Sequence, residues 1–255
     1  MTNSNNKIAL ITGGSRGLGK NSALQLAQKG FDIIITYQSQ KEEAAKTVSE
    51  IQSLGRKAAF LALDLANISS FDSFATHLKN TLTSDFGVER FDALVNNAGS
   101  GYYASISETT EAGFDAMSDI HLKAPFFLTQ KLVPLLNDGG SIVNTSSGLS
   151  RFSYNGYAAY AIMKAAIDGL TRYQAVEFGP RKIRSNSVAP GAIETDFGGG
   201  AVRENKELNQ MISNLTPLGR VGQPDDIGGV VAFLCSDESK WVNGQRIEAS
   251  GGIHI

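Results

Sequence analysis

The sequence has little of several features that would commit a chain of 255 residues to a specialised class of protein. Its single cysteine, Cys235, cannot form an internal disulfide, and its setting in Ala-Phe-Leu-Cys predicts a small buried side chain. The net charge is only −2, so no overall field would attract nucleic acid or an anionic membrane surface. No apolar run approaches about 18 residues, and the polar first residues lack the apolar core of a signal peptide. We therefore expect a cytoplasmic protein that binds neither nucleic acid nor a membrane.

The chain does contain a regular alternation of short apolar runs with longer amphipathic stretches, which is typical of repeated βα units on a parallel sheet. Because the runs are almost wholly apolar, we expect helices to cover both faces of this sheet. The predicted strands are 7–12, 32–37, 57–63, 93–96, 141–145, 184–189 and 245–248, and the predicted helices are 18–29, 41–54, 69–85, 110–136, 157–178 and 225–236. We predict an α/β fold in one domain, residues 1–255, on a doubly wound parallel sheet of about seven strands.

Two places depart from this regular pattern. Pro125 falls inside the fourth helical stretch, where its missing N–H and its ring should kink or divide the helix. The connection 191–222 is polar, glycine-rich at 198–200 and long for a compact unit. Long connections of this kind are often lids, so we expect this one to close over a substrate.

A glycine cluster follows the first predicted strand, in Ile-Thr-Gly-Gly-Ser-Arg-Gly-Leu-Gly, with glycines at 13, 17 and 19. Glycines let a backbone approach a pyrophosphate closely, and the first turn of the next helix offers free N–H groups to it. The spacing Gly-x-x-x-Gly-x-Gly differs from the commoner Gly-x-Gly-x-x-Gly, and the cluster could instead only form a tight turn.

Polar residues also stand at the carboxyl ends of two further predicted strands, where open parallel sheets bind ligands. Asp64 ends the third strand and is placed to accept from an adenine amino group, or else to cap a turn. The run Asn96-Asn-Ala-Gly99 ends the fourth strand, and we expect its backbone to pack along a nucleotide rather than only to turn the chain.

Tyr160 and Lys164 are one helical turn apart, in Tyr-Ala-Ile-Met-Lys. Residues four apart project from the same helix face, so the lysine ammonium can lie beside the phenol and favour its ionised form. The pKa of a phenol is normally about 10, and a neighbouring cation lowers it toward the range useful for proton transfer. A surface tyrosine and lysine that merely share a helix face are the alternative.

In their order and spacing these motifs resemble the short-chain dehydrogenase/reductase family over essentially the whole chain, and most closely its 3-oxoacyl-(acyl carrier protein) reductases. Further motifs that carry the resemblance are Ser147, thirteen residues before Tyr160, together with Pro190-Gly191, Thr195, Pro217-Leu-Gly-Arg and Gly244-Gln. The resemblance implies a nicotinamide dinucleotide on a Rossmann-like sheet. It also implies a homotetramer, with the fifth and last long helices and the carboxyl-terminal strand at the interfaces.

The resemblance assigns catalytic roles to named residues. Ser147 would hold a carbonyl oxygen that Tyr160 protonates, and Lys164 would lower the pKa of Tyr160 and bind the nicotinamide ribose. Relatives usually carry an asparagine where this chain has His121. We expect His121 to lie near Lys164, with its backbone carbonyl or imidazole holding a water of a proton relay; the alternative is a packed helix histidine without a catalytic part.

The residues expected to bind the cofactor come from the glycine turn, the strand ends and the segment that begins the lid. In the lid segment, the resemblance places the Ile193 main chain at the carboxamide and the Thr195 hydroxyl near the pyrophosphate or carboxamide. No metal site is expected, because the histidines and the cysteine lack ligand-like spacing. The expected cofactor contacts are Gly13, Ser15, Arg16, Gly17, Leu18, Gly19, Tyr37, Ser39, Asp64, Leu65, Asn97, Ala98, Gly99, Tyr160, Lys164, Pro190, Gly191, Ile193 and Thr195.

The charge after the second strand bears on which dinucleotide binds. An NAD site typically carries an acid there for the ribose diol, whereas a nearby arginine accommodates a 2′-phosphate. The segment 37–41 contains no acid, and Arg16 stands where NADP-preferring relatives carry a basic residue. NADP(H) is therefore favoured over NAD(H), although Arg16 could be only a solvated turn charge.

These expectations describe an NADPH-dependent carbonyl reductase for a small-molecule carbonyl or alcohol, similar to the 3-oxoacyl-(acyl carrier protein) reductases. A sugar or polyol dehydrogenase and a non-catalytic dinucleotide sensor are the alternatives. Residues expected at the mouth of the site are Tyr102, Tyr103, Phe152, Tyr154 and Phe197, which suggest a pocket that tolerates apolar or aromatic substrates. Candidates for a basic docking patch for acyl carrier protein are Arg151, Arg203 and Arg220.

Overall fold

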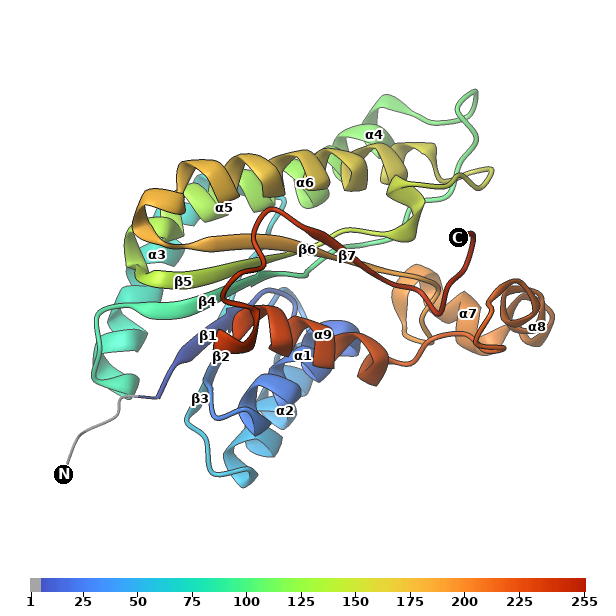
Figure 1. Cartoon of the computed structure of the whole chain (residues 1–255). Coiled ribbons are helices and arrows are strands. Elements are labelled where there is room, and N and C mark those ends of the chain that lie inside the picture. The colour runs from blue at the N-terminus through green and yellow to red at the C-terminus, as the bar shows by residue number, and fades with distance from the viewer. Residues whose placement is uncertain (1–5) are drawn as a thin grey trace.

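A computed structural model describes residues 6–255. Its seven strands form one sheet in the order β3-β2-β1-β4-β5-β6-β7, and all six neighbouring pairs are parallel. The chain moves outward from β1 to β3 and then returns to β4, so the order reverses between β1 and β4 (Figure 1). The strands are β1 Ile8–Ile11, β2 Asp32–Tyr37, β3 Ala58–Ala62, β4 Phe91–Asn96, β5 Leu136–Thr145, β6 Arg184–Pro190 and β7 Arg246–Ala249. This arrangement confirms the predicted doubly wound parallel sheet.

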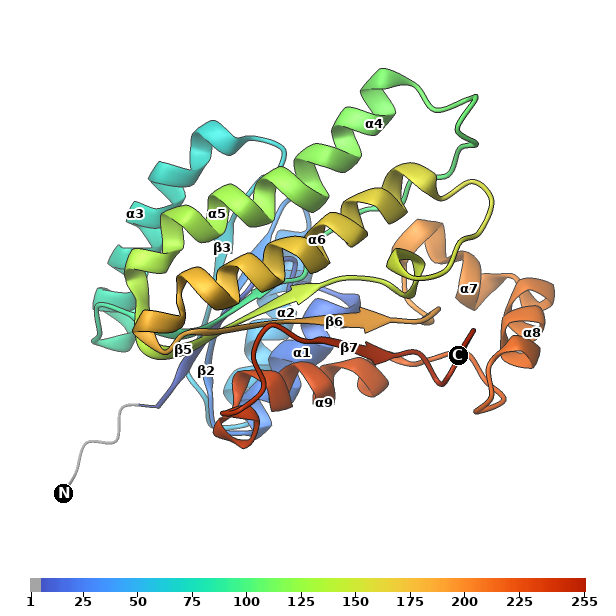
Figure 2. The same ribbon diagram turned by 45° about the horizontal axis from the view of Figure 1, so that its top comes forward.

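Helices cover both faces of the sheet, as Figures 1 and 2 show: α1, α2 and α9 lie on one side, and α3, α5 and α6 on the other. The helices are α1 Gly17–Gln28, α2 Lys41–Ser53, α3 Phe71–Thr81, α4 Glu111–Ser118, α5 Ala124–Leu132, α6 Ala158–Glu177, α7 Ala201–Glu204, α8 Lys206–Leu215 and α9 Pro224–Cys235. Among the described residues, no helix is long and apolar enough to cross a membrane.

The strand side chains alternate between two apolar cores, one on each face of the sheet. In β1, Ala9 and Ile11 pack with α1, α2 and α9, whereas Ile8 and Leu10 pack with α3 and α5. Cys235 lies in the first core at 4% exposure, which confirms the prediction that it is a buried packing residue. The sheet is thus held from both sides, and its strand ends are fixed in position.

The fourth predicted helix is divided where the sequence indicated. A π-helical segment, Asp119–Lys123, separates α4 from α5, and Pro125 stands in the first turn of α5. Proline has no N–H, so Pro125 cannot donate to the carbonyl of His121 four residues before it. The irregular turn places His121 inside the molecule, at 1% exposure.

The connection 191–222 contains two helices, α7 and α8, that the sequence pattern did not predict. Three glycines, 198–200, precede α7 with positive φ angles of 61°, 75° and 77°, a conformation that few other residues adopt easily. The side chain of Asn205 caps α8 by accepting from the N–H of Leu208 at 3.0 Å. In Figure 1 both helices lie beyond the carboxyl ends of the strands.

Candidate active site

The glycine turn after β1 is packed so closely that side chains would not fit. A Cβ on Gly13 would lie 2.8 Å from the Cβ of Ala98, and a Cβ on Gly19 would lie 2.2 Å from the carbonyl oxygen of Gly13. The first turn of α1 has no side-chain cap. Its N–H groups are therefore available to an anion such as a pyrophosphate.

The run that ends β4 braces this glycine turn. The hydroxyl of Thr12 accepts from the backbone N–H groups of Asn97 and Ala98, at 2.9 and 3.1 Å, and the Asn97 amide donates to the Thr12 carbonyl at 3.0 Å. The Asn97 side chain thus holds the turn that follows β1. The sequence placed this run at the correct strand end but did not indicate this contact.

Other predicted cofactor residues meet at the same edge of the sheet. Asp64 is exposed, and its Oδ1 accepts from the Gln38 amide at 3.0 Å and from the backbone N–H of Ala66 at 3.1 Å. A Cβ on Gly17 would lie 3.8 Å from the side chain of Thr195, so the beginning of the connection 191–222 adjoins the glycine turn. The ends of β1, β3 and β6 therefore contribute residues to one surface.

The structure brings Ser147, Tyr160 and Lys164 to this edge. The Lys164 ammonium donates to the carbonyl of Thr145 at 2.7 Å and lies 5.5 Å from the centroid of the Tyr160 ring. Tyr160 and Lys164 are 8% and 4% exposed, which contradicts the alternative of a surface pair. Ser147 begins a 3₁₀ helix, and its hydroxyl accepts from the N–H of Leu149 at 3.2 Å, which leaves the O–H free to donate elsewhere.

The sequence led us to expect that Lys164 lowers the pKa of Tyr160, and the structure contradicts that direction. Burial raises the pKa of Tyr160 to about 12, and the Ser147 hydroxyl opposes this only in part. Burial also lowers the pKa of Lys164 to about 7, against the opposing charge of Asp168. The lysine is therefore only partly charged near neutral pH and favours the phenolate weakly, so the phenol stays protonated and can act as an acid.

His121 lies against the Tyr160 ring, edge to face, with 5.1 Å between the ring centroids. Its Nε2 lies 2.7 Å from the carbonyl oxygen of Ser100, which can only accept, and 3.3 Å from the Ser100 N–H, which can only donate; we assign the ring proton to Nε2 on the shorter contact. Its Nδ1 is buried and has no partner among the described residues. The pKa of His121 falls to about 3, first through burial and then through the positive charge of Lys164. The imidazole is thus neutral, with a bare acceptor atom beside the catalytic candidates.

Gly99 explains how the histidine fits. A Cβ on Gly99 would lie 2.5 Å from the Cε1 atom of His121, so only a glycine leaves room for this ring. Ser146, which directly precedes Ser147, donates through its hydroxyl to the Lys164 carbonyl at 3.3 Å and faces α6. Ser146 therefore has a packing role, whereas the hydroxyl of Ser147 is held by the N–H of Leu149.

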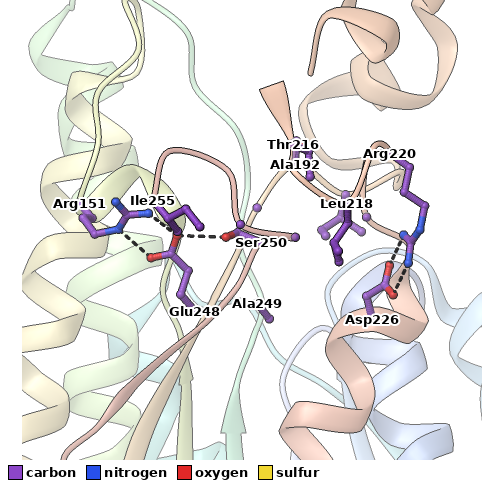
Figure 3. A pocket seen from close by; sticks show the side chains of 15 residues that line it. Arg151, Ala192, Thr216, Leu218, Arg220, Asp226, Glu248, Ala249, Ser250 and Ile255 are labelled. Atoms are coloured by element: carbon purple, nitrogen blue, oxygen red, sulfur yellow. Dashed lines mark hydrogen bonds and ion pairs between the residues drawn. The ribbon is translucent and has the colours of Figure 1, made fainter. Parts of the chain in front are cut away.

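A cavity of about 460 Å³ lies beside these residues rather than among them. Figure 3 shows its walls, which include the segment 191–193 but none of Ser147, Tyr160 or Lys164. The three arginines proposed for a docking patch are all paired within the chain. The pairs are Arg151 with Glu248 at 2.6 Å, Arg203 with Asp196 at 2.8 Å and Arg220 with Asp226 at 2.6 Å. Each of these arginines is thus offset by a neighbouring carboxylate, although its side chain stays partly exposed.

Comparison with known proteins identifies the family to which this arrangement belongs. A family model described as Enoyl-(Acyl carrier protein) reductase matches residues 13–254. The hydroxynaphthalene reductase-like protein Arp2 of Metarhizium brunneum (strain ARSEF 3297) is 36% identical over 257 residues, covering 96% of this chain and 94% of Arp2. The chain belongs to the short-chain dehydrogenase/reductase family. This short-chain dehydrogenase/reductase is accordingly an NAD(P)-dependent enzyme that acts on carbonyl or alcohol groups.

Solved structures show the same fold for this short-chain dehydrogenase/reductase. One of them is the promiscuous reductase LugOII, which catalyses keto-reduction at C1 during lugdunomycin biosynthesis. It superimposes on this chain with a TM-score of 0.92 at 35% identity, and the match covers 98% of each chain. The angucycline C-6 ketoreductase LanV with bound NADP has a TM-score of 0.92 at 34% identity, covering 97% of this chain and 95% of LanV. LanV has also been solved with NADP and rabelomycin.

Proposed function

We propose that this enzyme is an NADPH-dependent ketoreductase in which Ser147 and Tyr160 hold the ketone oxygen. When bound, the nicotinamide cofactor supplies the hydride. Ser147 donates from its free O–H, and Tyr160, kept protonated by burial, transfers its proton to the developing alkoxide. Lys164, held by the Thr145 carbonyl, adds positive charge beneath the phenol and restores its proton. The burial of the Tyr160 phenol beside Ser147 and the Lys164 ammonium is the observation that carries this proposal.

His121 takes part in this proposal as the holder of a relay water. With its proton on Nε2, the bare Nδ1 can accept from a water that also contacts Lys164. The neutral ring and the positive charge that it feels from Lys164 support this placement. The residue would then replace the asparagine of related enzymes in position but would bind the water through a different atom.

The preferred cofactor in this proposal is NADP(H) rather than NAD(H). The segment 37–41 at the end of β2 carries no acid, and Arg16 lies within the glycine turn with an exposed side chain whose Nη1 is 3.5 Å from the Asp196 carboxylate. That pair is long and exposed, so it would yield readily to a 2′-phosphate. The NADP bound to LanV supports the same preference.

The proposed substrates are ketones on fused aromatic rings. The ring centroid of Tyr160 lies 5.7 Å from that of Phe197, at the start of the segment that leads into α7, and the ring centroids of Phe152 and Tyr154 are 5.6 Å apart. Flat aromatic walls suit flat substrates, and the hydroxynaphthalene in the name of Arp2 and the angucycline in that of LanV support this chemical class; the name of LugOII supports ketone reduction. The paired arginines give a 3-oxoacyl group on acyl carrier protein less support.

The assembly proposed here is a cytoplasmic homotetramer. A groove of about 360 Å³ runs between α5 and α6. Its lining is mixed: it includes the exposed aromatic residues Phe126 and Tyr173, 47% and 70% exposed, and also the polar residues Thr129, Gln130, Gln174 and Glu177. At one end of the sheet, β7 is an edge strand among the described residues. Exposed apolar grooves and open edges are the surfaces that copies of a chain bury against each other.

A panel of substrates tests the activity. The purified enzyme would be assayed with NADPH and NADH on tetralone, on an acetoacetyl thioester of N-acetylcysteamine and, in the oxidative direction, on a polyol. We expect the fastest turnover with NADPH and tetralone. Tyr160→Phe should lower kcat by about a thousandfold while NADPH still binds. Faster turnover of the thioester or the polyol would contradict the proposed substrate class of aromatic ketones. A Tyr160→Phe enzyme that stays active would contradict the mechanism.

A further inference from the structure

Beneath Ser147 lies a chain of four alternating charges that the catalytic proposal does not use. Asp168 of α6 contacts Arg246 of β7, with 3.2 Å between Oδ2 and Nε. Arg246 donates to Glu248 at 2.8 Å, and Glu248 accepts twice from Arg151, at 2.6 and 2.8 Å. Figure 3 shows the Arg151 end of this chain. The side chains of Arg246 and Asp168 are only 22% and 11% exposed, so these contacts are screened less than surface pairs.

Arg246 joins this chain of charges directly to the turn that carries Ser147. One Nη of Arg246 donates to the backbone carbonyl of Ser147 at 3.0 Å, and its Nε donates to the hydroxyl of Ser150 at 3.1 Å. The Ser150 hydroxyl in turn donates to Asp168 at 2.7 Å. Asp168 also accepts from Ser187 of β6 at 3.0 Å, so three elements meet under the turn.

These contacts fix the direction of the Ser147 hydroxyl. Ser147 is in an extended conformation, with φ of −159° and ψ of 153°, and its Oγ is held by the N–H of Leu149. Its carbonyl, on the other side of the same residue, is held by the rigid fork of Arg246. A guanidinium tied to two carboxylates cannot turn freely, so the serine backbone is held from both sides.

We propose that Arg246 is a positioning residue that orients Ser147 for the ketone, with Asp168 and Glu248 holding its guanidinium in place. This inference rests on the catalytic role proposed for Ser147. Nothing in the motif pattern marks Arg246, because it lies 99 residues after Ser147 on the edge strand. A small error in the placement of a catalytic group costs up to about a hundredfold in rate, which is the scale of effect that Arg246 would control.

The test is a double-mutant cycle between Arg246 and Ser147, measured as kcat for NADPH-dependent reduction of tetralone. Arg246→Met keeps the length of the side chain and removes its donors, and we expect kcat to fall between about tenfold and a hundredfold with the Kd for NADPH unchanged. In the Ser147→Ala background the same substitution should change kcat less than about twofold, because the hydroxyl that it orients is gone. Full additivity, or an unchanged kcat in the single variant, would overturn the inference.

Arg181→Met is the matched control. Arg181 also binds two backbone carbonyls, those of Val133 and Leu136, and a carboxylate, Asp138, but it does so far from Ser147. Its loss should leave kcat within about twofold of the wild type. Should Arg246→Met fail to fold by circular dichroism, Arg246→Lys serves the same cycle, with an intermediate loss expected. If Ser147→Ala alone keeps full activity, the role proposed for Ser147 fails, whatever Arg246 does.

Discussion

At the scale of single residues, burial decides the chemistry more than charge pairing does. The pKa of Tyr160 rises to about 12 and that of Lys164 falls to about 7, because both groups lie away from water. A tyrosine that stays protonated suits ketone reduction, in which the phenol must give up a proton. The reverse reaction, alcohol oxidation, needs the phenolate and should therefore be favoured at higher pH.

The pH dependence of His121 variants tests the relay. In the wild type, the kcat for tetralone reduction should fall as pH rises through about 7, because Lys164 loses its charge there. His121 itself does not titrate in this range, since its pKa is about 3. His121→Ala should lower kcat by about tenfold or more and steepen the alkaline fall, because the relay water loses its acceptor.

His121→Asn is the matched variant, because an asparagine keeps a polar group that can hold the water. Its profile should stay close to that of the wild type. Stopped-flow or steady-state rates between pH 5 and pH 9 would provide both profiles. Profiles that are unchanged in both variants would end the relay proposal and leave His121 as a packed histidine.

At the scale of elements, the glycine turn and the first turn of α1 act as one unit. Gly19→Ala would place a Cβ 2.2 Å from the Gly13 carbonyl oxygen and 2.6 Å from the Asn97 amide nitrogen. The turn would have to open, and we expect the Kd for NADPH to rise by at least about tenfold, measured by fluorescence titration.

Gly229→Ala gives the control for that substitution. Gly229 lies inside α9, and a Cβ there would meet nothing within 4 Å. Alanine favours a helix over glycine by about 0.5–1 kcal/mol, so the variant should unfold at a slightly higher temperature and bind NADPH normally. Normal NADPH binding by Gly19→Ala would show that the close approach of backbone at this turn is not needed for the cofactor.

At the scale of the whole molecule, the α5/α6 groove should be buried between copies of the chain. Tyr173→Glu places a charge in this groove, and we expect it to reduce a tetramer to smaller species in sedimentation velocity. Leu54→Glu is the control, because Leu54 is 44% exposed at the end of α2 and outside the groove. A wild-type enzyme that sediments as a monomer would contradict the proposed assembly.

The sequence by itself determined the order and type of most elements. Apolar runs and amphipathic stretches have local periods that survive without the rest of the structure, and β2 was predicted at its observed bounds. The glycine turn, Pro125 and the Tyr160–Lys164 pair are likewise local patterns, so their places could be predicted. The helix α7 could not, because it has only four residues and follows three glycines, whereas α8 has an asparagine cap and an amphipathic pattern that the prediction missed.

Only the tertiary structure decided what those residues experience. The pKa of Tyr160 shifts upward because little water surrounds the phenol. That burial is produced by elements that lie far apart in the sequence. The same is true of the Arg246 contact with Ser147 and of the space that Gly99 leaves for His121. Local patterns in the sequence determine which side chains each element carries. Burial and long-range contacts arise only when the elements pack together, and they determine the protonation and orientation of those side chains.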